Sequence, residues 1–137
     1  MNKNKFDVPE PKSFEQKVDE MATQMVFDFK QYRGEKLSMS GYLGQLQSKF
    51  PGSAEIRSAR VTTISSAEYL RALKQIGDKV RSKIILEDPS DGDLIFYNLY
   101  LKQIEKAVNE RLKIFGSCSK VEVEPIYNPI LDTGPEK

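Results

Sequence analysis

One segment, residues 88–116, constrains the fold more than any other part of the sequence. Its apolar residues recur at steps of three and four, which places them on one face of an α-helix. They are Leu94, Tyr97, Leu101, Ile104, Val108, Leu112 and Phe115. Asp88 is expected to cap the helix, Pro89 suits its first turn, and Gly116 is expected to end it. At about 1.5 Å per residue, this helix at residues 88–115 would be roughly 40 Å long.

Helical periodicity also marks two other long segments and one short segment. Both long segments begin with a capping box, in which a serine is followed three residues later by Gln or Glu: Ser13 with Gln16, and Ser65 with Glu68. The short segment contains two glycines, each of which costs about 1 kcal/mol relative to Ala in a helix. The sequence therefore predicts a mainly α fold with three principal helices and one short helix, at residues 13–33, 65–84, 88–115 and 38–49.

Two segments lack helical spacing and favour extended structure. Residues 56–64 are rich in Val, Thr and Ile, and residues 119–124 alternate apolar and charged side chains before a proline. The two segments can pair as a two-stranded β ribbon, with glutamates of one strand near arginines of the other. The expected fold class is therefore mainly α with a minor β contribution.

The length of 137 residues is typical of one domain. We expect a polar N-terminal arm, a single helical domain and a C-terminal tail, at residues 1–12, 13–127 and 128–137. No stretch approaches the roughly 18 apolar residues of a membrane span, and the arm lacks the apolar core of a signal peptide. The sequence therefore predicts no membrane association and no secretion by a signal peptide. We expect a cytoplasmic location, or one within an assembled particle.

Histidine is absent from the sequence, and Cys118 is the single cysteine. Histidine is the usual base near neutral pH and the commonest metal ligand, so Ser-His, Cys-His and His-metal chemistries are excluded. One cysteine excludes an intrachain disulfide and argues against a zinc site. We therefore expect a protein that is not an enzyme, with no catalytic residue, no cofactor and no metal.

Two of the predicted helices carry more apolar residues than one core-facing stripe needs. Val26 and Phe27 broaden the stripe of the first helix, and Phe96 and Tyr100 lie off the main seam of the long helix. Surplus apolar surface of this kind is typical of a protein interface. The leading hypothesis is a structural or adaptor protein that associates through its helices. Its partner would be another protein or a second copy, and it would serve as a repeated subunit of a larger assembly such as a phage or virion particle.

A basic region gives the first alternative. The net charge is only +1, yet residues 49–83 contain eight basic residues against three acidic ones. Clustered basic side chains can contact the phosphates of a nucleic acid. The alternative function is therefore a small nucleic-acid-binding protein. Its contacts would come from Arg57, Arg60, Arg71, Lys74, Arg81 and Lys83.

An acidic cluster at residues 88–93 gives the second alternative, a carboxylate-based or metal-dependent enzyme using Asp88, Asp91 and Asp93. A calcium loop of the EF-hand type needs a bidentate acid at its twelfth position. Counted from Asp88, that position is Leu99, so the pattern fails. Acids at the start of a helix also stabilise its exposed N–H groups. Helix capping is therefore the expected role of the cluster.

Overall fold

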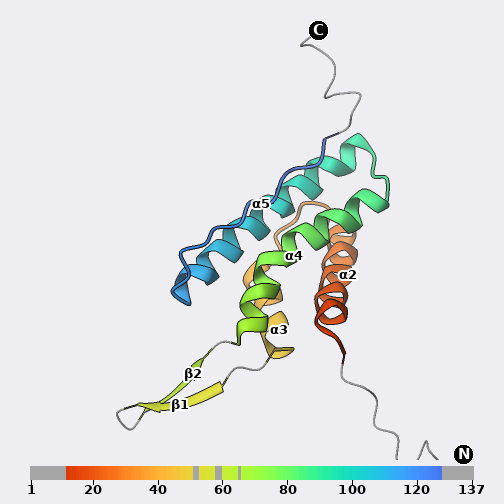
Figure 1. The fold of residues 1–137 in the computed structure, drawn as a ribbon. Coiled ribbons are helices and arrows are strands. Elements are labelled where there is room, and N and C mark those ends of the chain that lie inside the picture. The colour runs from red at the N-terminus through yellow and green to blue at the C-terminus, as the bar shows by residue number, and fades with distance from the viewer. Residues whose placement is uncertain (1–11, 51–52, 58–59, 65, 128–137) are drawn as a thin grey trace, which may run out of the picture.

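Within the described residues, four α-helices and one two-stranded ribbon make up the fold (Figure 1). The structure is a computed structural model. The residues it describes are 12–50, 53–57, 60–64 and 66–127. The elements are α2 (Phe14–Tyr32), α3 (Met39–Ser48), β1 (Ser53–Arg57), β2 (Arg60–Ile64), α4 (Ala67–Leu86) and α5 (Asp91–Ile114). The predicted mainly α fold, with three principal helices and one short helix, is confirmed.

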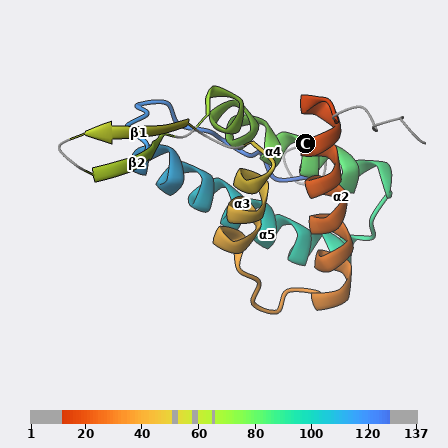
Figure 2. The ribbon, with the colours of Figure 1, turned by 90° about the horizontal axis from the view of Figure 1, so that it is seen from below.

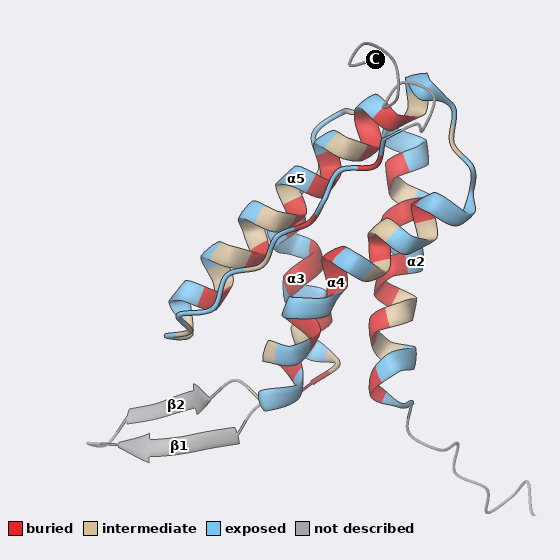
Figure 3. Cartoon of the chain, turned by 45° about the horizontal axis from the view of Figure 1, so that its top comes forward, coloured by how far each residue is buried: buried red, intermediate tan, exposed pale blue. Residues whose placement is uncertain are grey.

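All four helices contribute to one apolar core, and their buried positions lie along the faces that meet (Figure 3). Among the described residues, no charged side chain is buried. Four buried tyrosines place their rings in the core and donate their hydroxyl hydrogens to acceptors at its edge, as buried tyrosines usually do. The pairs are Tyr42 with the Asp28 carboxylate, Tyr69 with the Leu43 carbonyl, Tyr97 with the Glu87 carboxylate and Tyr100 with the Glu35 carbonyl.

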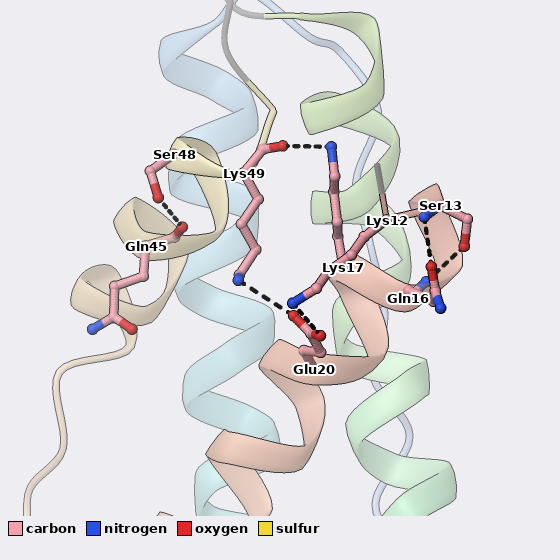
Figure 4. Close-up of polar contacts among 8 residues, drawn as sticks. All are labelled: Lys12, Ser13, Gln16, Lys17, Glu20, Gln45, Ser48 and Lys49. Carbon is pink, nitrogen blue, oxygen red and sulfur yellow. Dashed lines mark hydrogen bonds and ion pairs between the residues drawn. The ribbon is translucent and has the colours of Figure 1, made fainter. Parts of the chain in front are cut away.

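The start of α2 has the predicted capping box (Figure 4). Ser13 Oγ accepts a hydrogen bond from Gln16 N at 3.2 Å, and Ser13 N donates to Gln16 Oε1 at 2.8 Å. The same end of α2 is fastened to the end of α3. Lys17 Nζ donates to the Lys49 carbonyl at 2.9 Å, and Lys49 Nζ lies 3.7 Å from the Glu20 carboxylate. The capping box therefore fixes the start of α2, and the contacts of Lys17 and Lys49 hold the end of α3 beside it.

The start of α4 lies one residue later than predicted. The N-cap is Ser66, whose Oγ accepts from Tyr69 N at 3.0 Å and donates to the Phe50 carbonyl at 3.1 Å. Ser65, the predicted cap, lies outside the described residues. The third helical residue is then Tyr69 rather than Glu68, so no capping box can form. The bond to Phe50 favours Ser66, because it also joins the helix start to the end of α3.

The long helix α5 ends as predicted near Gly116, although it begins three residues later than expected. Gly116 has φ +80° and its N–H donates to the Lys113 carbonyl at 3.0 Å. The N–H of Ser117 donates to the Leu112 carbonyl at 2.9 Å. These two bonds form a Schellman motif, which turns the chain back along the helix it has just left.

The ribbon forms between partners other than the predicted ones. Strands β1 and β2 pair with each other as an antiparallel hairpin in which Arg57 lies opposite Arg60. Residues 119–124 are described and form no strand. The predicted pairing of residues 56–64 with residues 119–124 is therefore wrong. Closing a short local hairpin costs less chain entropy than pairing segments that are about sixty residues apart. Figures 1 and 2 show the hairpin extending away from the helices.

The segment that was expected to be a strand instead lies along α5 (Figures 1 and 2). We call residues 121–127 the strap. Asn109 accepts from the N–H of Val121 at 2.8 Å and donates to its carbonyl at 3.0 Å. Asn98 makes the same two bonds to Ile126, at 2.7 and 2.9 Å. Side chains of α5 therefore supply the hydrogen-bond partners that the strap backbone would otherwise have found in a neighbouring strand.

A membrane-crossing helix is not found in the described parts of the chain. No helix there combines sufficient length with sufficient apolar character to span a bilayer.

The turn after α2 depends on the hydroxyl of Tyr100. This oxygen accepts from Gly34 N at 2.9 Å and donates to the Glu35 carbonyl at 2.6 Å, while the ring stacks on Phe29 with centroids 4.4 Å apart. Tyr100→Phe removes both bonds and is expected to lower the free energy of unfolding by about 1–3 kcal/mol, because two backbone groups lose their partner. Urea denaturation measures the change.

The matched control is Tyr127→Phe, because the Tyr127 side chain is 64% exposed. This control is expected to leave the free energy of unfolding unchanged within a few tenths of a kcal/mol. Equal effects at the two positions would contradict the role assigned to the Tyr100 hydroxyl.

Candidate functional site

An apolar groove of about 350 Å³ lies between α2 and the end of α4. Phe27 and Leu86 line it, and their side chains remain 55% and 84% exposed. Val26 also lines it but is only 3% exposed, so it forms part of the floor. We call this the α2–α4 surface, consisting of Thr23, Val26, Phe27 and Leu86 with the charged residues at its edge. Exposed Phe and Leu beside a hollow are typical of a site that a partner covers.

The charges at the edge of the α2–α4 surface are paired with each other. Lys30 Nζ lies 3.1 Å from the Glu87 carboxylate, and Lys83 Nζ lies 2.7 Å from the Asp19 carboxylate. Glu87 also accepts a hydrogen bond from the hydroxyl of Tyr97 at 3.2 Å. An apolar centre with a polar edge is the usual composition of a protein interface. The balanced pairs give this surface no strong charge of either sign.

Three of the four predicted interface residues are buried. Val26 is 3% exposed and forms the floor of the groove. Phe96 is 6% exposed, Tyr100 is 0% exposed and neither lines the groove, so the prediction of an interface at these two positions is wrong. The last turn and the C-cap of α2 cover them: Phe29 stacks on Tyr100, and the Arg33 guanidinium lies 5.0 Å from the Phe96 ring centroid. The wide apolar face of α5 serves neighbours within the chain. The interface at Phe27 stays a prediction, with Val26 beneath it.

The basic residues predicted to bind nucleic acid do not form one free patch. Arg71 lies 3.6 Å from the Glu15 carboxylate, with its guanidinium 3.9 Å from the Phe14 ring centroid. Arg81 Nε donates to the Glu124 carbonyl at 2.9 Å. Lys83 is paired with Asp19, Lys74 is exposed, and Arg57 and Arg60 lie opposite each other in the β1–β2 hairpin. Most of the described side chains in this set are therefore used within the chain.

A different set of lysines surrounds an open groove of about 630 Å³ beside the second half of α5. Lys102, Lys106 and Lys113 come from α5, and Lys120 comes from the segment before the strap. None of the four has a carboxylate within 4.0 Å among the described residues. Two glutamates, Glu105 and Glu110, line the same groove, so positive charge is in excess there.

The lysine groove is not evident from the sequence, for an identifiable reason. Lys102, Lys106 and Lys113 are spaced by four and seven residues, which is the spacing of one helix face and was available as a signal. Acidic residues interrupt the sequence between them, so the local net charge is small. Lys120 joins them only because the chain turns back after Gly116.

The acidic residues at 88–93 lie around the start of α5, with Asp91 and Asp93 in its first turn. The N-cap of α5 is Ser90, whose Oγ accepts from Asp93 N at 3.2 Å, and Asp93 also pairs with Arg33 at 3.2 Å. Asp88 has φ +51° and lies in the turn before α5, so the prediction that it caps this helix is wrong. Within the described ranges, no group of three or more His, Cys, Asp or Glu residues could hold a metal ion. The arrangement therefore gives no support to a metal-dependent site there.

The buried tyrosines are held in their neutral form. Burial raises the pKa of Tyr42 above its usual value, and the hydrogen bond and charge of Asp28 add to this. Burial likewise raises the pKa of Tyr97, with the neighbouring charge of Glu87 adding to it. A phenolate that could act as a base or nucleophile is therefore not available at these two positions near neutral pH.

The chain matches no protein-family model, and neither the curated proteins nor the solved structures include a significant match. The α2–α4 surface and the lysine groove are therefore the main evidence for a function.

Ser90→Ala tests the capping role of the 88–93 segment. The substitution removes the Oγ acceptor at the start of α5 and is expected to lower the free energy of unfolding by about 1 kcal/mol. Urea denaturation measures it. Ser82→Ala is the control, since Ser82 is exposed within α4 and Ala is the better helix former there. A loss at Ser82 as large as that at Ser90 would contradict the capping role.

Proposed function

We propose that the chain is a non-enzymatic structural or adaptor protein whose copies associate through their helices, as repeated subunits of a larger assembly. The observation that carries this proposal is the α2–α4 surface. Phe27 and Leu86 expose large apolar side chains on two different helices and line the same hollow. Leaving both in water costs free energy that contact with a partner would recover.

A second copy of the chain is the partner that this surface fits best. In a two-fold symmetric contact the same patch meets itself, so it must offer both a projection and a hollow. Phe27 and Leu86 give the projections, and the 350 Å³ groove gives the hollow. Like charges placed opposite one another would oppose such a contact. The pairing of Lys30 with Glu87 and of Lys83 with Asp19 removes this obstacle.

Approximate free energies indicate that two isolated copies associate only weakly through the α2–α4 surface. Burying an exposed Phe or Leu side chain contributes about 1.5–3 kcal/mol, so two on each copy give roughly 6–12 kcal/mol. Association costs an estimated 4–15 kcal/mol in lost freedom of motion, which is of the same size. The surface is therefore expected to bring copies together at high concentration, or where several contacts act at once in an assembly.

Phe27→Ser combined with Leu86→Ser is expected to abolish association through the α2–α4 surface. The wild-type protein should show a concentration-dependent rise in mass by sedimentation or light scattering, and this rise should be clearly smaller in the double variant. Both side chains are mainly exposed, so the stability of the monomer should change by less than about 1 kcal/mol.

Ile114→Ser is the matched control, because Ile114 is 77% exposed and lies at the far end of α5 (Figure 1). This variant is expected to associate as the wild type does. A wild-type chain that stays monomeric at the highest attainable concentration would overturn the proposal. So would association that the Phe27 and Leu86 substitutions leave unchanged.

A second candidate function, nucleic-acid binding, is favoured by the lysine groove rather than by the basic region at residues 57–83. Lys102, Lys106 and Lys113 follow the axis of α5 for about 16 Å, which suits a linear series of phosphates. No aromatic side chain lines this groove among the described residues, so it offers contacts to the sugar-phosphate backbone rather than base stacking.

If this second function is correct, Lys106→Glu with Lys113→Glu should weaken binding of a fluorescent DNA duplex at least tenfold, as measured by anisotropy. Binding of the wild type should fall steeply as salt rises, because each neutralised phosphate releases counterions. Lys74→Glu, on an exposed position of α4, is the control and should have little effect. Absence of binding at low salt would exclude this function.

A further inference from the structure

The strap is held in the way that a bound peptide is held in a groove. Its backbone has no strand beside it among the described residues, and side chains of α4 and α5 supply its hydrogen bonds. Asn98 and Asn109 each bond both the N–H and the carbonyl of one strap residue. Glu105 accepts from Val123 N at 2.9 Å, and Arg81 donates to the Glu124 carbonyl at 2.9 Å. Contacts to a backbone recognise any extended segment, and pockets for alternate side chains then select among them.

The spacing of the two asparagines matches the length of the segment they hold. Eleven residues of α5 separate Asn98 from Asn109, which corresponds to a rise of about 16 Å. Five extended residues separate Val121 from Ile126, and at about 3.3 Å each they also span about 16 Å. Each amide therefore replaces one hydrogen-bonded residue of a neighbouring strand, because it offers a donor and an acceptor together.

A close fit of side chains supplies the selectivity of this groove. Val123 is 5% exposed and packs against Gly77 of α4, in the apolar core that also contains Ile104 of α5. A Cβ atom on Gly77 would overlap a methyl group of Val123. Ile126 is 9% exposed and fills the next position along the groove. The groove therefore accepts an extended segment with a branched apolar residue opposite Gly77.

The segment that joins the strap to α5 is held much less firmly. Gly116, Cys118, Ser119 and Lys120 are all exposed. Between the Schellman motif and the strap, the described chain makes one local hydrogen bond, from Ser119 N to Ser117 Oγ at 3.1 Å. The strap can therefore leave the groove as a unit, with the loss of its own hydrogen bonds and of the core contacts of Val123 and Ile126.

We infer that the groove between α4 and α5 is an extended-peptide site that receives the strap of a second copy, so that two copies exchange straps reciprocally. This inference rests on the proposed association of copies and names a contact through which it occurs. The occupant is a second copy because each copy carries the segment that already fits the groove. An exchanged pair reforms every contact made within one chain, so exchange changes the connection and not the interactions.

Two complementary variants test the exchange. Gly77→Ala obstructs the groove for a strap with Val123, whereas Val123→Ala leaves a small strap in an unaltered groove. Neither variant packs well alone. In an exchanged pair, the obstructed groove of the Gly77→Ala chain receives the small strap of the Val123→Ala chain. The unaltered groove of the Val123→Ala chain receives the full-sized strap of its partner, so both sites are filled without overlap.

Both chains also carry Phe27→Ser and Leu86→Ser, which removes the α2–α4 surface from the measurement. The expected result is a one-to-one heterodimer on mixing, detected by native mass spectrometry. Its melting temperature should exceed that of either variant alone and rise with concentration. If the Gly77→Ala chain is unfolded alone, its recovery on addition of the Val123→Ala chain is the supporting result.

A single chain with both Gly77→Ala and Val123→Ala is the control for the contact itself. It should be a monomer that is more stable than the Gly77→Ala chain, because the overlap is relieved within one molecule. A double variant no more stable than the Gly77→Ala chain overturns the inference, because the two residues would not be in contact.

A mixture that retains only the two parent species after equilibration also overturns the exchange, and the strap is then part of its own subunit's core. These results are distinct from a failure of the proposed function. In that case chains with Phe27 and Leu86 restored would associate no more than the Phe27→Ser and Leu86→Ser chains, whatever the variants of Gly77 and Val123 do.

Discussion

The long helix α5 has an apolar face that is wider than any one neighbouring helix can cover, and the rest of the fold is arranged around this face. Phe96 and Tyr100 meet the end of α2 and its turn, while Leu101, Ile104 and Val108 belong to the core shared with the other helices. The strap lies along another side of α5, where Asn98 and Asn109 form hydrogen bonds with its backbone. Surplus apolar residues on a helix therefore do not by themselves mark an external interface.

The parts of the fold that depend on neighbouring residues could be predicted from the sequence. The helices, the capping box at Ser13 and the stop at Gly116 follow from periodicity and local hydrogen bonding. The choice between adjacent candidates for a cap could not be predicted, because Ser66 is selected by a bond to Phe50, which is distant in the sequence. Alternation in residues 120–124 indicates an extended segment equally well whether its partner is a strand or a row of helix side chains.

In the candidate surfaces, too, the residues that could be predicted are those identified by local sequence, and the residues brought in by packing could not be predicted. Phe27 was identified because it lies off the core-facing stripe of α2, but its neighbour Leu86 belongs to the end of α4 and is brought to it only by packing. Lys120, the fourth lysine of the lysine groove, lies near the three lysines of α5 only because the chain turns back at Gly116. The basic side chains at Arg71 and Lys83 gain acidic partners from α2, which no local pattern contains.

The contact between Gly77 and Val123 has a consequence for sequence evolution. Each residue limits the size of the other, although they are separated by 46 positions and belong to segments that no local rule connects. Homologous chains that gain a side chain at the first position are expected to carry a smaller one at the second, so the two sites should covary. Such covariation would arise whether the two residues belong to one chain or to two exchanging copies.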